Sequence, residues 1–173
     1  MQPSCIDGRG VVLFNSLNET SQDVMGVSLS GGKPFTVVGG PGQQTNGEVA
    51  PDDRWLAYVE VGSNGRSAFV TTYPTPGPKW QVADDTAYWL WWAGNGRQIY
   101  YLTGNGEIKR VDVTFEGNSV QFSAPQFLVN VNVNTNRRGL TMSADGRRIV
   151  AAAVIDDDAG AAILVSNFDA ATR

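Results

Sequence analysis

The stretch Ala50-Pro51-Asp52-Asp53-Arg54-Trp55-Leu56-Ala57-Tyr58-Val59 joins a polar turn directly to a run of apolar and aromatic residues. The same order recurs at three further turns, Asp7-Gly8-Arg9, Asn95-Gly96-Arg97 and Asp145-Gly146-Arg147. Asn, Asp and Gly adopt the positive φ angles that tight hairpins need, and Asp53 stands where the other copies have Gly. The four arginines are 45, 43 and 50 residues apart, which is the repeat length of a β-propeller blade.

Each copy continues with the same series of expected strands, which are short and rich in β-branched and aromatic residues. The strand after the turn covers 11–14, 55–59, 99–102 and 149–155, and the next covers 24–29, 68–72, 108–113 and 162–166. Outer strands follow at 35–38, 80–82 and 127–131, and innermost strands at 46–50, 88–92 and 139–143. The pattern predicts one all-β domain of about four antiparallel four-stranded blades, at approximately 1–45, 46–85, 86–135 and 136–173.

The two ends of this series do not match a finished ring. The fourth copy has no outer strand, and residues 1–6 can supply at most one inner strand. Blades bury their faces against neighbouring blades, so an open stack of four would leave two apolar faces in water. We therefore expect the chain to be part of a larger ring, completed by further blades or by a second copy of the chain.

Composition excludes several classes of function. The chain has 173 residues, a net charge of −4 and no Lys/Arg stripe, which argues against nucleic-acid binding. It has one cysteine, Cys5, and no histidine, so the usual general base and the commonest metal ligand are missing. We expect no cofactor and no metal. The sequence contains no run of about 20 apolar residues, so it predicts no membrane span. The acidic pairs and runs at 84–85 and 156–158 fit solvated turns better than a calcium loop.

Several segments resemble one group of propellers. The stretch from Ala50 to Val59 is similar to the Ser-Pro-Asp-Gly-Arg-Trp repeat of TolB-like propellers. The segment Tyr73-Pro-Thr-Pro-Gly-Pro-Lys-Trp-Gln-Val82 resembles a loop and strand of the C-terminal propeller of bacterial membrane-anchored serine/threonine kinases. Trp92 with Asn95-Gly96, the segment Gly106–Val113, the turn Ser143–Arg148 and the end Ala162–Phe168 match the same group.

The resemblance implies a TolB-like propeller that acts outside the cytoplasmic membrane as a sensor or interaction module. In that location it would bind a protein, a small molecule or a carbohydrate. The chain itself has no Gly-rich nucleotide loop and no His-Arg-Asp catalytic loop, so any kinase would be a separate domain. We therefore expect a non-catalytic module.

The best candidate ligand-binding residues are the aromatic side chains between residues 80 and 101, above all Trp80, Tyr88, Trp89 and Trp91. Exposed aromatic rings are frequent binding anchors, although packing between blades is the favoured explanation of this segment. If residues 88–92 form one strand, Trp89 and Trp91 share one face, and Tyr88, Leu90 and Trp92 share the other. The Asn-rich loop adds Asn132 and Asn134, whose amides would lie on one face.

An enzyme is the alternative hypothesis. The chain has no Gly-x-Ser-x-Gly elbow, and a histidine-dependent triad is impossible. Propeller hydrolases or lyases that act on carbohydrate can assemble paired carboxylates from separate blades. Carboxylates that converge on the channel would favour such an enzyme, and a channel lined by small or apolar residues would favour the interaction module.

Overall fold

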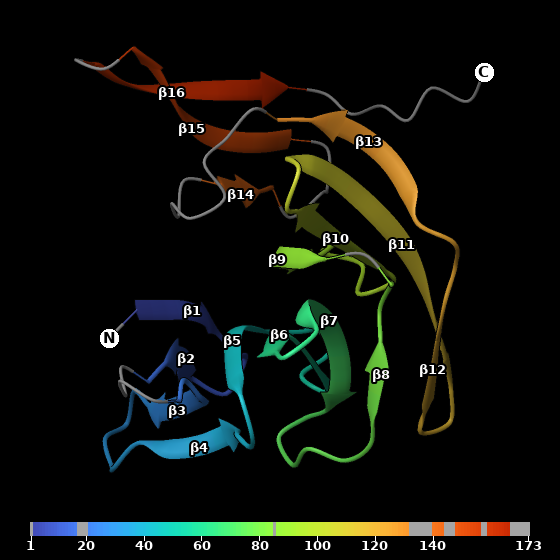
Figure 1. The fold of residues 1–173 in the computed structure, drawn as a ribbon. Helices are drawn as coiled ribbons and strands as arrows, with labels where there is room; N and C mark the ends of the chain where they lie inside the picture. Colours follow the sequence, from blue (N-terminus) through green and yellow to red (C-terminus); the bar gives the residue numbers. More distant parts are fainter. Residues whose placement is uncertain are drawn as a thin grey trace.

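The computed structural model describes residues 2–16, 21–84, 86–131, 140–143, 148–156 and 159–166. Within these ranges the chain forms β-strands joined by turns, and it contains no helix. The strands belong to four antiparallel sheets that follow one another along the chain (Figure 1). The predicted all-β architecture of propeller blades is confirmed.

The first two sheets are simple meanders of four strands. The first contains β1 (Gln2–Ile6), β2 (Val11–Asn15), β3 (Val24–Ser28) and β4 (Phe35–Val38), in that order. The second contains β5 (Gln43–Val49), β6 (Trp55–Gly62), β7 (Gly65–Thr72) and β8 (Lys79–Gln81), also in chain order.

The third sheet is larger, and the fourth has three strands among the described residues. The third contains β9 (Ala87–Trp92), β10 (Gln98–Thr103), β11 (Glu107–Glu116), β12 (Ser119–Phe122) and β13 (Gln126–Asn130). The fourth contains β14 (Leu140–Met142), β15 (Arg148–Asp156) and β16 (Ala159–Ser166). All of the predicted strands are present, with bounds that differ by a few residues.

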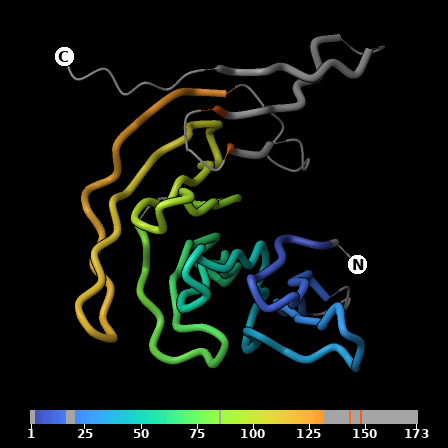
Figure 2. The backbone as a smooth tube through the Cα atoms, turned by 180° about the vertical axis from the view of Figure 1, so that it is seen from behind, coloured from blue at the N-terminus to red at the C-terminus, as the bar shows by residue number. Residues whose placement is uncertain are grey.

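The sheets are arranged along an arc, with the first strand of each sheet on its inner side (Figures 1 and 2). The first and second sheets pack face to face, as do the second and third, and the alternation of side chains along β6 shows how. Leu56 and Tyr58 are buried against the first sheet, in a cluster with Leu13 and Val24. Trp55, Ala57 and Val59 are buried on the other face, in the larger cluster that β6 forms with the third sheet.

One strand was not predicted. The third strand of the third unit was expected at 108–113, but β11 continues to Glu116 and turns back at Gly117 into β12. Gly117 has a φ of 61°, and Glu116 pairs with Ser119, so the turn has two residues. The outer edge of β11 is therefore shared, because β13 pairs with its first half and β12 with its second half. This hairpin brings Phe115 to the second sheet.

The first sheet has an apolar face that no described residue covers well. Ile6, Val12 and Val27 are partners in register and so share the face opposite Leu13. Ile6 is 58% exposed, and Leu29, just beyond β3, is 69% exposed. This is the kind of face that a neighbouring blade would bury.

Candidate functional site

In the second and third sheets, the turns between the innermost and second strands are built on one hydrogen-bonding scheme. In the second sheet the N–H of Ala50 donates to the carbonyl of Trp55 at 2.8 Å, and in the third sheet Ala93 donates to Gln98 at 2.9 Å. The side chain of Asp52 accepts from the N–H of Arg54 at 3.0 Å, and Asn95 accepts from that of Arg97 at 2.8 Å.

The residues at the tips of these two turns confirm the predicted turn chemistry. Asp53 has a φ of 55° and Gly96 a φ of 64°. Both therefore lie in the left-handed region, which Asp tolerates better than most residues.

The first turn does not have the frame that the Asp-Gly-Arg motif predicts. The N–H of Asp7 donates to the carbonyl of Val11 at 3.0 Å, so Asp7 is the structural equivalent of Ala50 and Ala93. The positive φ of 79° falls on Gly10, one residue before the strand, and not on Gly8. This turn is one residue shorter. The N–H of Arg9 donates to the side chain of Asp7, as those of Arg54 and Arg97 do to Asp52 and Asn95, so the local motif is kept, but it lies one residue farther from the following strand. The structural repeat is 43 residues for both steps, from Asp7 to Ala50 and from Ala50 to Ala93.

The junction between the first and second sheets is closed around Asp7. Its carboxylate is fully buried and accepts hydrogen bonds from the N–H of Val11 at 2.7 Å and from the hydroxyl of Tyr73 at 2.9 Å. The N–H and Nε–H of Arg9 donate to the same carboxylate at 3.0 and 3.1 Å. Burial alone would raise the pKa of Asp7, but these hydrogen bonds from Val11, Tyr73 and Arg9 bring it below its ordinary value.

Other contacts complete this closed junction. The guanidinium of Arg9 lies over the Tyr73 ring, 4.7 Å from its centroid. The N–H of Gly8 donates to the Asp53 carboxylate at 3.1 Å, and a Cβ at Gly8 would lie 2.5 Å from an oxygen of that carboxylate. Burial raises the pKa of Tyr73, and the hydrogen bond to Asp7 raises it further, so its hydroxyl stays a donor.

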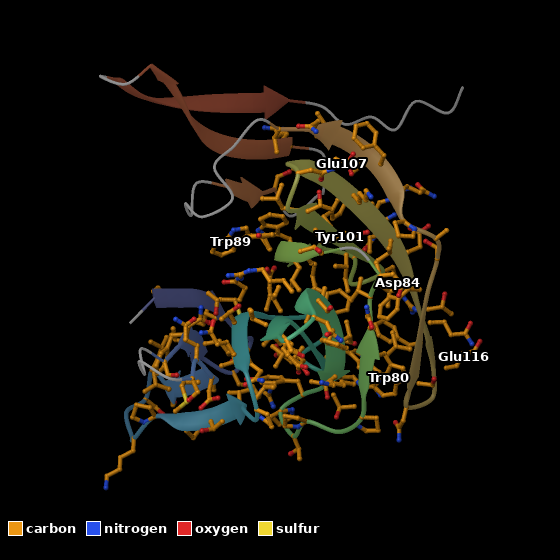
Figure 3. All side chains as sticks on the ribbon, viewed as in Figure 1. Trp80, Asp84, Trp89, Tyr101, Glu107 and Glu116 are labelled. Carbon is orange, nitrogen blue, oxygen red and sulfur yellow. The ribbon has the colours of Figure 1, made fainter. Side chains whose placement is uncertain are left out.

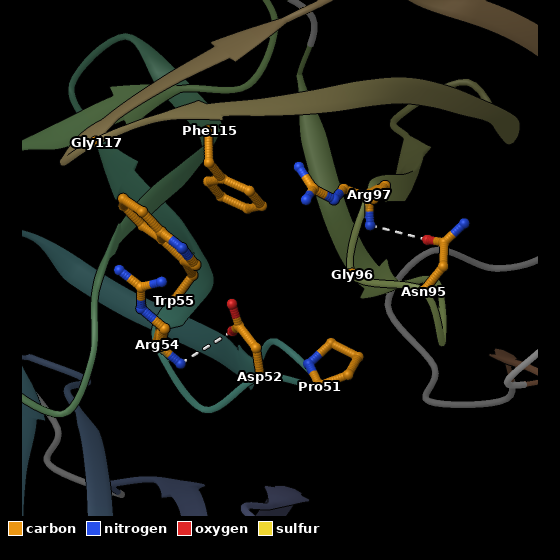
Figure 4. A pocket seen from close by; sticks show the side chains of 9 residues that line it. All are labelled: Pro51, Asp52, Arg54, Trp55, Asn95, Gly96, Arg97, Phe115 and Gly117. Atoms are coloured by element: carbon orange, nitrogen blue, oxygen red, sulfur yellow. Dashed lines mark hydrogen bonds between the residues drawn. The ribbon is translucent and has the colours of Figure 1, made fainter.

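The junction between the second and third sheets is open at the same place. A cavity of about 550 Å³ lies between the two turns. Pro51, Asp52, Arg54 and Trp55 line it from the second sheet, and Asn95, Gly96, Arg97, Phe115 and Gly117 from the third (Figure 4). Here the two turns approach each other less closely, because a Cβ at Gly96 would meet Pro51 at an ordinary contact distance of 3.6 Å.

Aromatic rings form one wall of the cavity. The half-buried ring of Phe115 stacks on buried Trp55, with centroids 4.8 Å apart and planes 18° apart. Trp80 also packs edge to face against Trp55, at 5.8 Å and 70°. The wall is held in place by the core of this junction, to which Trp55 belongs.

Two arginines face this cavity from the two turns. Arg54 and Arg97 are exposed, and within the described ranges neither guanidinium forms an ion pair. The guanidinium of Arg97 lies 5.6 Å from the centroid of Phe115 (Figure 4). A guanidinium presents several donors in one plane, which suits a carboxylate or another planar oxyanion.

A carboxyl group lies deeper in the same junction. Glu48 on β5 accepts a hydrogen bond from the N–H of Trp92 at 3.3 Å, and the Trp92 indole donates to the Glu48 carbonyl at 3.1 Å. Burial raises the pKa of Glu48 to about 7, against a smaller opposing effect of the Trp92 N–H. The thiol of Cys5 lies nearby, and burial raises its pKa to about 12.

The predicted site residues are distributed over different parts of the molecule (Figure 3). Trp80 lies on β8 and packs against the core, and Trp89 and Trp91 pack with Leu102 and Ile108. The predicted alternation along β9 is confirmed in part, because Leu90 and Trp92 belong to the other cluster. Asn132 and Asn134 lie outside the described residues.

Tyr88 lies at a second, smaller cavity. This cavity of about 330 Å³ is lined by residues that include Tyr88, Thr103, Asn105 and Glu107. The guanidinium of Arg66 lies 4.7 Å from the centroid of the Tyr88 ring. The described residues contain no group of three or more Cys, Asp or Glu side chains that could hold a metal ion.

The sequence pattern does not predict the main cavity, because its turn residues are also what the scaffold requires. Arg54 and Arg97 are elements of the repeat, and Phe115 lies in a hairpin that the expected strands do not include. The signal for that hairpin was present, since Gly117-Asn118 is a typical two-residue turn between alternating segments.

The chain was compared with known proteins. No family model matches it, and no curated protein sequence matches it. Solved structures do match. TolB from Acinetobacter baumannii has a TM-score of 0.67 and 14% identity, over 96% of this chain and 43% of that one. A putative TolB from Agrobacterium tumefaciens has a TM-score of 0.64 and 20% identity, over 88% of this chain and 53% of that one.

Enzymes of the same architecture are also similar. A gluconolactonase from Xanthomonas campestris has a TM-score of 0.62 and 12% identity, over 86% of this chain and 54% of that one. The chain thus spans about half the length of each of these three proteins. At such identities the similarity concerns the fold alone, and the chain has the fold of a TolB-like β-propeller.

Proposed function

We propose that this chain is a non-catalytic interaction module that binds a ligand in the cavity between its second and third sheets. The observation that carries the proposal is that two exposed arginines, which form no ion pair with any described residue, face one cavity from successive turns. Its volume of about 550 Å³ is within the usual range for small-molecule sites. Loops on a rigid scaffold are common places for binding residues.

The ligand class follows from the resemblance only in broad terms: a protein, a small molecule or a carbohydrate. The location outside the cytoplasmic membrane and a sensory role beside a kinase rest on the resemblance to kinase-linked propellers. No helix among the described residues is long and apolar enough to cross a membrane.

Further blades or a second copy would cover the apolar face of the first sheet, where Ile6 and Leu29 are exposed. Association of two copies of the chain can be tested by measuring its mass in solution as a function of concentration. A monomer at every concentration would exclude the homodimer.

An enzyme that acts on carbohydrate, a hydrolase or lyase, is the second candidate. Its supporting observation is Glu48, whose pKa of about 7 suits proton transfer near neutral pH. The test is an assay with lactones and glycosides on the wild-type chain and on Glu48→Gln. Turnover that Glu48→Gln abolishes would favour the enzyme and contradict the non-catalytic module.

The binding function can be tested by amide-resolved NMR with a panel of saccharides, amino-acid derivatives and short peptides. We expect at least one probe to shift the amide signals of Gly96 and Gly117, which line the cavity. Gly31 and Gly32, in the connection between β3 and β4, serve as internal controls. If no probe shifts the cavity signals, or the shifts fall only elsewhere, the proposal is wrong.

A further inference from the structure

We propose that the cavity binds a ligand with a single carboxylate on a ring, and that Arg54 and Arg97 hold the carboxylate. This inference rests on the proposed function and deepens it by naming the chemical class of the ligand. An aromatic acid and a uronic acid share this chemistry, and the experiment below distinguishes them.

Within the described ranges, the two arginines of the cavity have free donors, unlike the arginine of the first turn. In the first turn an aspartate lies within reach of its arginine, and the Arg9–Asp7 pair forms at 3.1 Å. In the second turn Asp52 uses an oxygen to accept from the backbone N–H of Arg54, and no ion pair with the guanidinium forms. The donors of Arg54 and Arg97 therefore remain available to a ligand on the cavity side. Arg–carboxylate pairs are frequently bidentate, which gives direction as well as affinity.

The lining of the cavity is charged. Among the residues that line the cavity, Arg54 and Arg97 are positive and Asp52 is negative, so the cavity has a net charge of +1. A monoanion neutralises this charge, whereas a phosphate or a polyanion would place additional negative charge beside Asp52. The charge balance thus favours one carboxylate.

Apolar rings lie beside the arginines. Phe115 presents a half-buried ring that is stacked on Trp55 at 4.8 Å, and Pro51 contributes a second apolar ring from the opposite turn. The two lie on different sides of the cavity (Figure 4). Ring faces are complementary to such surfaces, so the part of the ligand next to the carboxylate is a ring.

The experiment is an NMR titration with matched probes. Phenylacetate is compared with phenylacetamide, which lacks the charge, and with acetate, which lacks the ring. Glucuronate is compared with glucose, which lacks the carboxylate. We expect each ring acid to bind at least about tenfold more tightly than its neutral counterpart, a factor of ten being the usual scale of one good charged contact. The tighter of the two acids identifies the type of ring.

Single arginine substitutions show which side chains bind the carboxylate. Arg54→Gln and Arg97→Gln should each weaken binding of the acid at least about tenfold, with little effect on the neutral counterpart. Arg66→Gln is the matched control, because it removes the same charge from the other end of the second sheet, where Arg66 pairs with Val61. Unchanged thermal midpoints check folding, and the acid–neutral comparison on the wild-type chain needs no variant.

Three results would overturn the inference: equal binding of acids and neutral counterparts, unchanged binding in both arginine variants, or an equal loss in Arg66→Gln. If the neutral probes shift Gly96 and Gly117 as strongly as the acids do, the ligand class is wrong but the proposed function survives. If neither these probes nor the wider panel shift the cavity signals, the proposed function itself fails.

Discussion

The junction between the first and second sheets and the junction between the second and third sheets use similar turns for different purposes. At the first junction Asp7, Arg9 and Tyr73 form a closed network, and Asp53 binds the backbone of Gly8. At the second junction Arg54 and Arg97 border a cavity of about 550 Å³. The difference comes from a turn that is one residue shorter and places an aspartate at the buried position held by Ala50 and Ala93.

The comparison teaches that a repeated motif does not define a repeated environment. A buried carboxylate with several donors stabilises the fold, and the same donors are then unavailable for binding. Where alanine takes the buried position, the arginine of the turn is released to solvent. The predictions below test this division between a structural and a binding junction.

The largest effect is expected for Asp7→Ala. The substitution leaves the hydroxyl of Tyr73 and the N–H of Val11 without their acceptor in a buried site, and we expect a loss of about 2–4 kcal/mol in the free energy of unfolding. Urea unfolding measures this loss. The matched control is Asp52→Ala, whose exposed carboxylate accepts one backbone hydrogen bond and should cost about 1 kcal/mol or less.

Asp7 should also make the stability of the chain depend on pH. Since the pKa of Asp7 is lowered from 3.8 by folding, its stabilisation is present above that value and is lost as pH falls through the lower pKa of the folded state. The acid-induced loss of stability should therefore be smaller in Asp7→Asn than in the wild-type chain. Equal acid sensitivity of the two would contradict the closed network.

Glu48→Gln tests the interior of the open junction. Folding raises the pKa of Glu48 from 4.5 to about 7, so the folded state binds the proton more tightly and stability falls as pH rises through this window. The substitution should remove this fall and stabilise the chain at pH 8 by up to about 3 kcal/mol. Unfolding at pH 5 and pH 8 measures both effects. If the wild-type chain instead becomes more stable from pH 5 to pH 8, and the stability of the variant is the same at both pH values, Glu48 is not buried in this way.

Tyr73→Phe tests one contact of the closed junction. The variant keeps the ring under Arg9 and removes the hydroxyl that donates to Asp7, so we expect a loss of about 1.5 kcal/mol in the free energy of unfolding. A double-mutant cycle with Asp7→Ala should show coupling, because both changes remove the same hydrogen bond. Additive effects would mean that the hydrogen bond does not contribute.

The smallest effect on stability is expected for the double variant Arg54→Gln/Arg97→Gln. Both side chains are exposed and form no ion pair among the described residues, and the guanidinium of Arg97 lies near the Phe115 ring. We expect a change below about 1 kcal/mol. A loss as large as that of Asp7→Ala would assign these arginines to the fold and not to binding.

The sequence predicted the strands well, because alternation and turn residues are local signals that burial between sheets reinforces. It predicted the left-handed conformation of Asp53 for the same reason. It could not predict the frame of the first turn, since the short motif Asp-Gly-Arg is present there but is followed by one additional residue, Gly10, before the strand. Nor could it predict the cavity, which depends on the contact of Phe115 with Trp55 across two sheets. That contact follows from the packing of distant segments, which no local pattern contains.

The most direct test compares the three arginines in one titration. The side-chain Nε–H signals of Arg9, Arg54 and Arg97 can be assigned from single Arg→Gln variants and followed by NMR while phenylacetate is added. We predict that the signals of Arg54 and Arg97 shift in a saturable manner, whereas that of Arg9, which is already bonded to Asp7, stays in place. If Arg9 shifts together with the other two, or if Arg54 and Arg97 do not respond, the division into a closed and a binding junction is contradicted.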